Sequence, residues 1–196
     1  MKDNDYFLAG IAAISIAVLF PISWIYELVF FSSNIAEYQL SFKFGLSSIL
    51  FLIVGLASIY MYSQFMKLLH DHHNYKRADF AIISMIVVCA LFYIGSFVLD
   101  ITSLWSDSLL STAASSWIFA ASIIVFGIVD LLIGVTILAG HKELPEQFKI
   151  FAIFNLIMGV FEMTFIMSPI VLILLPVVTV LIALIFFKKP DMIEIV

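Results

Sequence analysis

Four acidic residues lie inside or at the edges of long apolar stretches, and these side chains are the best placed to do chemistry. Asp130 lies near the middle of the apolar stretch 116–140, with no basic residue close to it in sequence. A carboxylate near the centre of a bilayer costs at least about 2.5 kcal/mol, so it must be protonated, hydrogen-bonded, hydrated or bound to a cation. Asp130 is therefore a candidate for binding a proton or a cation.

The other acids are expected nearer the outer boundary of the membrane. Glu162 should lie a few residues inside that boundary, whereas Glu27 and Asp100 should lie at it, as interfacial or helix-end residues. Asn155 lies in the next apolar stretch, which runs back in the opposite direction, and comes to nearly the same depth as Asp130. We therefore predict an ion- or proton-binding site of Asp130, Glu162 and Asn155. The alternative is a neutral acid that only ties two helices together.

A string of histidines raises the question of a metal site. His70, His72 and His73 surround Asp71, and these residue types are common metal ligands. Adjacent residues on a helix point about 100° apart, so this string is a weak candidate and favours a hydrated turn at a helix end. No histidine lies within an apolar stretch, which argues against haem held by paired histidines. We expect no metal and no cofactor.

The elements that carry these residues are apolar helices. The chain has 196 residues, of which 64% are hydrophobic and only 12% charged, and a soluble domain cannot bury so much apolar surface. We predict an all-α integral membrane protein, one polytopic domain built as a bundle of six transmembrane helices. The predicted spans are 6–30, 44–69, 80–101, 116–140, 148–167 and 169–187.

The basic residues predict the orientation of the bundle. Six spans put both termini on one side, and eight of the nine basic residues then fall on that side. These are Lys2, Lys67, Lys76, Arg77, Lys142, Lys149, Lys188 and Lys189, against Lys43 on the opposite side. Both termini should therefore face the cytoplasm, in a plasma or inner membrane. The break between the last two spans is placed at Ser168-Pro169, because proline starts helices well and interrupts them badly.

Small and polar residues mark the helix faces that should pack together, because helix association in lipid gains little from the hydrophobic effect. Such faces contain Gly55, Ser58 and Tyr62; Cys89, Tyr93, Ser96 and Asp100; Gly127, Asp130 and Gly134; and Ala152, Asn155, Gly159 and Glu162. Cys89, the single cysteine, is expected to be a small buried apolar group. Trp24, Trp105 and Trp117 all fall near the outer boundary, as in an aromatic belt.

Three classes of function fit this pattern. The first is a transporter or channel component, whose intramembrane carboxylates bind a proton or cation. The alternative is a non-catalytic membrane subunit or scaffold that binds lipids, other membrane proteins or a second copy of the chain. An intramembrane enzyme is less favoured, since only Glu27 with Asp100, or the histidine string, could supply its chemistry. The net charge of −5 without runs of like charge indicates no nucleic-acid partner.

Overall fold

A computed structural model describes residues 5–33, 44–102, 104–105, 112–140, 142–164 and 169–188. Within these ranges the regular structure is helical. The elements are α1 (Phe7–Ser33), α2 (Leu46–His73), α3 (Asp79–Cys89), the π-helical turn η2 (Ala90–Ile94), α4 (Gly95–Thr102), α5 (Thr112–Ala139), α6 (Glu146–Met163) and α7 (Val171–Phe187). The segments α3, η2 and α4 follow one another without a break.

Four of the described segments are long and apolar enough to cross a membrane. They are Phe7–Glu27, Leu46–His73, Asp79–Thr102 and Trp117–Ala139. α6 carries Glu146, Lys149 and Glu162, and α7 is apolar but has only 17 residues. The chain is therefore an all-helical protein whose long apolar helices indicate a membrane bundle.

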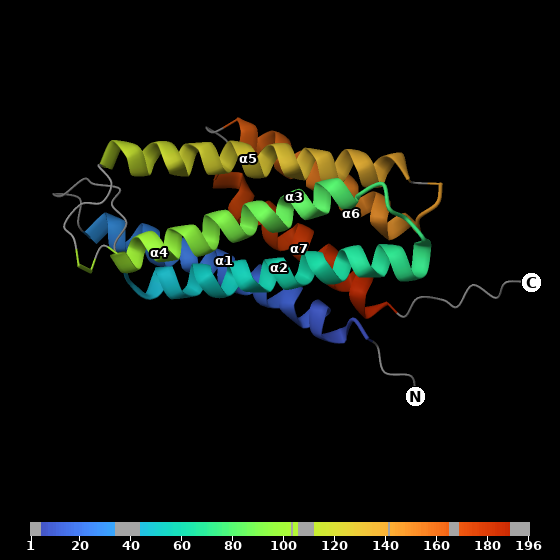
Figure 1. Cartoon of the computed structure of the whole chain (residues 1–196), viewed down its shortest axis with the longest axis horizontal. Helices are drawn as coiled ribbons and strands as arrows, with labels where there is room; N and C mark the ends of the chain where they lie inside the picture. The colour runs from blue at the N-terminus through green and yellow to red at the C-terminus, as the bar shows by residue number, and fades with distance from the viewer. Residues whose placement is uncertain are drawn as a thin grey trace, which may run out of the picture.

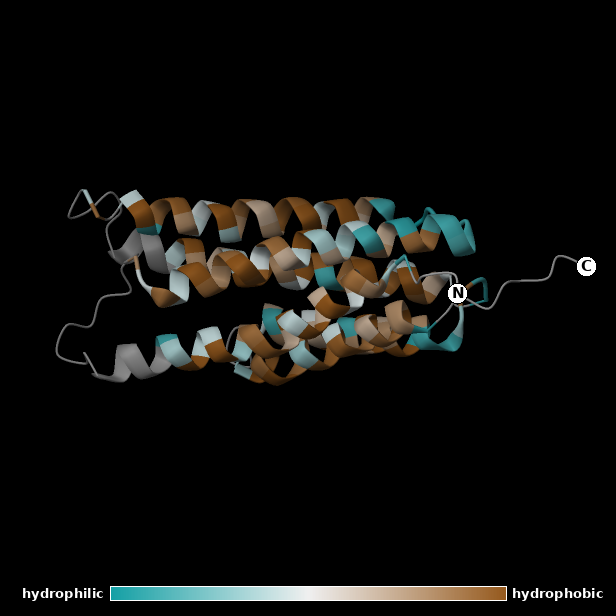
Figure 2. Ribbon diagram, turned by 90° about the horizontal axis from the view of Figure 1, so that it is seen from below, coloured by the Kyte–Doolittle hydropathy of each residue, from teal (hydrophilic) through white to brown (hydrophobic). Residues whose placement is uncertain are grey.

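The helices form a closed ring, visible as the bundle in Figure 1. α1 packs on α2, α2 on α3, α3 on α5, α5 on α6, α6 on α7, and α7 on α1. α1 begins and α7 ends at the same end of the bundle, which we call the terminal end; the opposite end is the far end. Hydrophilic residues gather at the terminal end, and apolar residues dominate the rest of the ribbons (Figure 2).

The outside of the ring is apolar over the length of the helices. Large side chains such as Leu8, Phe80, Leu91 and Ile173 are each at least 65% exposed. A soluble bundle would bury them, whereas hydrocarbon chains of a bilayer are an apolar solvent for them. The surface therefore agrees with the composition in indicating a membrane protein.

The helix bounds differ from the predicted spans in ways that have physical causes. α2 continues past Leu69 to His73, where Asn74 in the left-handed conformation (φ 47°) ends it and donates its N–H to the carbonyl of His70. α1 contains Pro21 and continues to Ser33, past the predicted end of its span at residue 30. α6 ends at Met163, before the predicted end of its span; residues 165–168, including Ser168, lie outside the described residues.

Candidate functional site

The candidate site is built on the close contact between α5 and α6. Gly127 lies opposite Gly159, since a Cβ placed on Gly127 would stand 2.9 Å from the Gly159 carbonyl oxygen. One helical heptad further along, a Cβ on Gly134 would stand 3.0 Å from the Ala152 carbonyl oxygen. Small residues at both points let the two antiparallel backbones touch, which brings the polar residues between them within bonding distance.

Asp130 and Asn155 lie halfway between these two contacts, one on each helix. The Asn155 amide nitrogen, Nδ2, donates to the Asp130 backbone carbonyl at 2.7 Å and to Asp130 Oδ1 at 3.2 Å. Both neighbours are acceptors, so the amide must present its nitrogen rather than its oxygen to them. The expected contact between these two residues is therefore present, and both side chains are buried, with 2% and 0% exposed.

Glu162 reaches the same place from the last turn of α6. It lies two turns beyond Asn155, but a helical side chain leans toward the N-terminus of its own helix. In antiparallel helices the side chains of Glu162 and Asp130 therefore lean toward one another, and their carboxyl groups lie within hydrogen-bonding reach of each other. Glu162 is 6% exposed. Two buried carboxyl groups thus lie in direct contact.

Two oxygen atoms in this cluster have no hydrogen-bond partner among the described residues. They are Oδ1 of Asn155 and Oε2 of Glu162, and both are buried. A buried acceptor without a donor costs free energy comparable to a lost hydrogen bond, about 1–3 kcal/mol. The cluster therefore retains open acceptor capacity, which is unusual in a purely structural contact.

Three further titratable side chains come close to the carboxyl pair from the other side of the ring. Tyr62 of α2, Cys89 of α3 and Tyr93 of η2 are all buried and interact electrostatically with Asp130. The sequence places each of them on a polar helix face but does not connect them to Asp130. Tyr93 lies on the π-helical turn Ala90–Ile94, and single turns of this kind are frequent at functional sites. The sequence does not reveal this turn, so it gave no pointer to the site.

Gly55 explains how Tyr93 is accommodated. A Cβ on Gly55 would collide with Cβ and Cγ of Tyr93, so the ring lies directly on the α2 backbone. The Tyr93 ring also packs against Phe126, one turn from Asp130 toward the far end, with 6.1 Å between centroids. Aromatic rings therefore cover the carboxyl pair on that side.

A second aromatic cluster lies nearer the terminal end. Phe65 of α2 packs against Phe148 and Phe151 of α6 and against Phe186 of α7, with centroid separations of 5.9, 5.3 and 6.4 Å. Phe65, Phe151 and Phe186 are each no more than 1% exposed. This cluster makes the interior of the bundle apolar on the terminal side of Asn155, which lies one turn from Phe151 on α6.

The two outer acids do not join this cluster. Glu27 is exposed, and Asp100 is half-buried with a side-chain hydrogen bond to Ser48 near the start of α2. Asp100 and Glu27 interact electrostatically with each other at the far end. They therefore lie at the far end, separate from Asp130, and their place at a membrane boundary stays a prediction.

The tryptophans divide into two kinds. Trp105 and Trp117 are 78% and 76% exposed, as membrane-belt residues would be. Trp24 instead points into the ring, where it packs against Phe51 of α2 and Phe119 of α5 at 5.8 and 5.5 Å between centroids. Trp24 therefore joins three helices at the far end, and its place in an aromatic belt stays a prediction.

The histidine string diverges into separate contacts. His70 Nε2 lies 2.6 Å from Asp79 Oδ1 of α3, the His72 ring packs on Tyr6, and the His73 ring packs on Phe148. Tyr6 in turn donates its hydroxyl to Asp71 at 3.1 Å. These residues lie on the last turn of α2, at a helix end as expected, and they connect it to its neighbours. Hydration of this turn stays a prediction. Among the described residues no group of three metal-ligating side chains of the His, Cys, Asp or Glu type converges.

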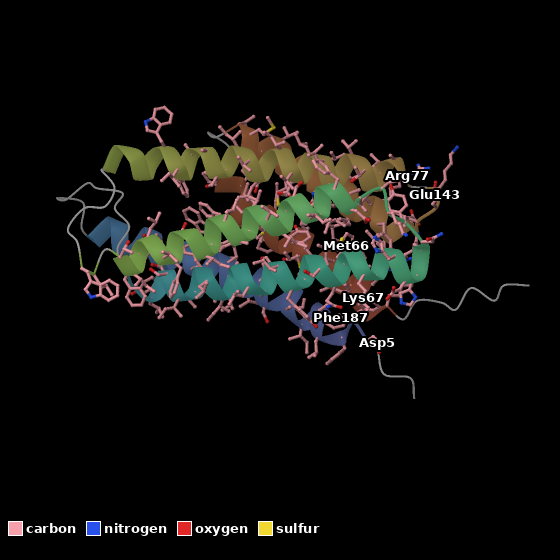
Figure 3. All side chains as sticks on the ribbon, in the orientation of Figure 1. Asp5, Met66, Lys67, Arg77, Glu143 and Phe187 are labelled. Carbon is pink, nitrogen blue, oxygen red and sulfur yellow. The ribbon has the colours of Figure 1, made fainter. Side chains whose placement is uncertain are left out.

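Two further contacts close the terminal end. Arg77 Nη2 lies 3.5 Å from Glu143 Oε1, joining the α2–α3 and α5–α6 loops (Figure 3). The Tyr75 hydroxyl donates to the backbone carbonyl of Thr136, and its ring lies against Gly140 in the place a Cβ would take. Burial raises the pKa of Tyr75 above its usual value of 10.0.

A comparison of the chain with protein-family models, with curated proteins and with solved structures finds no match.

Proposed function

We propose that this chain is a six-span membrane protein of the plasma or inner membrane, with its terminal end in the cytoplasm. α6 and α7 support the count, because they complete the ring between α5 and α1. The basic residues support the orientation. Every lysine and arginine in the described part of the chain lies at or near the terminal end: Lys67, Lys76, Arg77, Lys142, Lys149 and Lys188. Lys43, the predicted exception, lies outside the described residues.

Within this topology, the proposed activity is ion translocation, either as a small transporter or as a channel component. The observation that carries this proposal is that the carboxyl groups of Asp130 and Glu162 lie next to each other and are both buried inside the bundle. No basic side chain among the described residues forms an ion pair with either acid; the two described ion pairs both lie at the terminal end. Ionisable groups kept inside a membrane without a counter-ion are characteristic of proton and ion pathways.

The test is a flux measurement with purified protein in liposomes. Wild type should move protons or monovalent cations down an imposed gradient. Asp130→Asn should lower the flux rate at least about tenfold, which is equivalent to about 1.4 kcal/mol. Glu27→Gln is the matched control, because it also removes an acid of the spans but an exposed one, and its flux should equal that of wild type.

Flux that survives Asp130→Asn unchanged would contradict the proposal. Absence of flux in folded wild type would favour the second function, a non-catalytic subunit that binds lipids, other membrane proteins or a second copy of the chain. The apolar outer surface of the ring supports that function as well, because it offers lipid or protein contact on every helix.

A further inference from the structure

The contact between Asp130 and Glu162 constrains which ion can bind there. Two carboxyl groups form a hydrogen bond with each other only when at least one of them holds a proton. Two adjacent carboxylates that were both ionised would repel one another strongly in a low-dielectric interior. Asp130 and Glu162 are buried side by side, so the pair must hold at least one proton, and with a single proton it carries one negative charge.

The donors around Asp130 oppose a metal cation. The Asn155 N–H points at Oδ1, and a proton shared with Glu162 would add a second donor to the same carboxylate. A hard cation such as Ca²⁺ takes about six to eight oxygen ligands, and each donor hydrogen directed at a ligand oxygen competes with the ion for it. These two polar hydrogens satisfy the carboxylate. Such an arrangement suits a site that exchanges protons better than one that binds a metal ion.

The unpartnered oxygens show where one more proton can be accommodated. Oε2 of Glu162 and Oδ1 of Asn155 are buried acceptors without donors, on side chains that are 94% and 100% buried (6% and 0% exposed). A proton added to the pair gives it a second hydroxyl and therefore a donor for an open acceptor. Uptake of that proton also removes the net charge from an apolar interior, which favours binding.

We propose that the exchangeable ligand of this site is a single proton. The neutral pair holds two protons; release of one leaves one negative charge and the proton shared between Asp130 and Glu162. No covalent bond other than O–H changes, and no metal ion takes part. The titratable groups that face the pair are Tyr62 from α2, Cys89 from α3 and Tyr93 from η2. All three are neutral when protonated, so the described neighbours supply no counter-charge.

This inference rests on the proposed ion-binding role of the pair, but its test does not need flux. Infrared difference spectroscopy of the full chain in liposomes records the C=O stretch of protonated carboxyl groups as the pH is raised. We expect a carboxyl band from a buried group that titrates with the same midpoint in sodium, potassium, lithium or choline chloride at equal ionic strength. Asp130→Asn and Glu162→Gln should each remove this band, whereas Glu27→Gln should retain it.

Two results with the wild-type protein would overturn the inference. A midpoint that shifts by about one pH unit per tenfold increase of one alkali cation, relative to choline, means that this cation competes with the proton and overturns the inference. A wild-type spectrum without any titrating buried carboxyl overturns it also. Both measurements use the wild-type protein, so poor folding of a variant does not affect them. A titrating band without flux would reject the transport proposal and leave the proton site standing.

Discussion

The backbone carbonyl of Gly127 lies against Gly159, so that a Cβ built on Gly159 would stand only 2.7 Å from that oxygen. The same Cβ would stand 3.0 Å from the backbone nitrogen of Leu131. Neither neighbour is a flexible side chain, and neither can move without shifting α5. The contact therefore fixes the distance between the two helices that carry Asp130, Asn155 and Glu162.

Gly159→Ala should force α5 and α6 apart and destabilise the bundle. Overpacking of this kind costs about 1–3 kcal/mol. The measurement is the unfolding free energy in detergent or lipid. Gly95→Ala is the control: a Cβ on Gly95 meets nothing within 4 Å, and alanine favours the helix by about 1 kcal/mol over glycine. Equal stability of the two variants would show that the backbones do not touch.

Asn155→Leu should destabilise the protein by about 1–3 kcal/mol, because the Asp130 carboxylate loses a buried donor that leucine cannot replace. Thermal unfolding of the two proteins, each in the same lipid, measures the difference. The comparison variant is Ser63→Ala, which removes a hydroxyl that bonds only to the Ile59 carbonyl of its own helix. Its effect should stay within about 0.5 kcal/mol. A leucine variant as stable as wild type would remove Asn155 from the site.

Trp24→Ala should loosen the far end of the ring, since this ring contacts both Phe51 and Phe119. The loss should fall below the range of about 3–5 kcal/mol typical of a fully buried aromatic residue, because Trp24 is only half-buried. Trp117→Ala serves as the matched change at an exposed tryptophan and should leave the unfolding free energy in detergent nearly unchanged. If both variants leave the unfolding free energy nearly unchanged, Trp24 does not hold the helices together at the far end.

Several of these contacts could be predicted from sequence, and the reasons are specific. Asp130 and Asn155 meet because a short loop makes their helices antiparallel neighbours and places both residues at one depth. The seven-residue spacing of Gly127 from Gly134 recurs in Ala152 and Gly159, so the small residues of both helices come into register. Local spacing and helix geometry therefore determine this part of the site.

Other contacts could not be predicted, since they depend on where distant segments lie. The link from Glu162 to Asp130 spans two helical turns and requires both side chains to lean toward each other. The π-helical turn that presents Tyr93 has no signal in the run Ala90–Ile94, which is as apolar as its surroundings. The inward position of Trp24 follows from the placement of α2 and α5 around α1, which hydropathy does not encode.

The stability of the terminal end should fall at alkaline pH because of two tyrosines that lie just outside the apolar helices, Tyr6 before α1 and Tyr75 after α2. Burial raises the pKa of Tyr75, and burial together with the hydrogen bond to Asp71 raises the pKa of Tyr6, both from a usual value of 10.0. The folded protein thus holds these phenol protons more tightly than the unfolded chain does. Their contribution is complete below pH 10.0 and is lost as the pH rises through the folded values.

Unfolding free energies measured from pH 8 to pH 11.5 test this expectation. Tyr75→Phe should lose about 1 kcal/mol at pH 8, where the hydrogen bond to the Thr136 carbonyl is missing, and should then decline less steeply above pH 10 than wild type. Thr136→Val is the control, because it removes a hydroxyl but keeps the backbone carbonyl that accepts from Tyr75, so its alkaline decline should match that of wild type. A Tyr75→Phe variant with the full wild-type decline would show that this phenol does not ionise on unfolding.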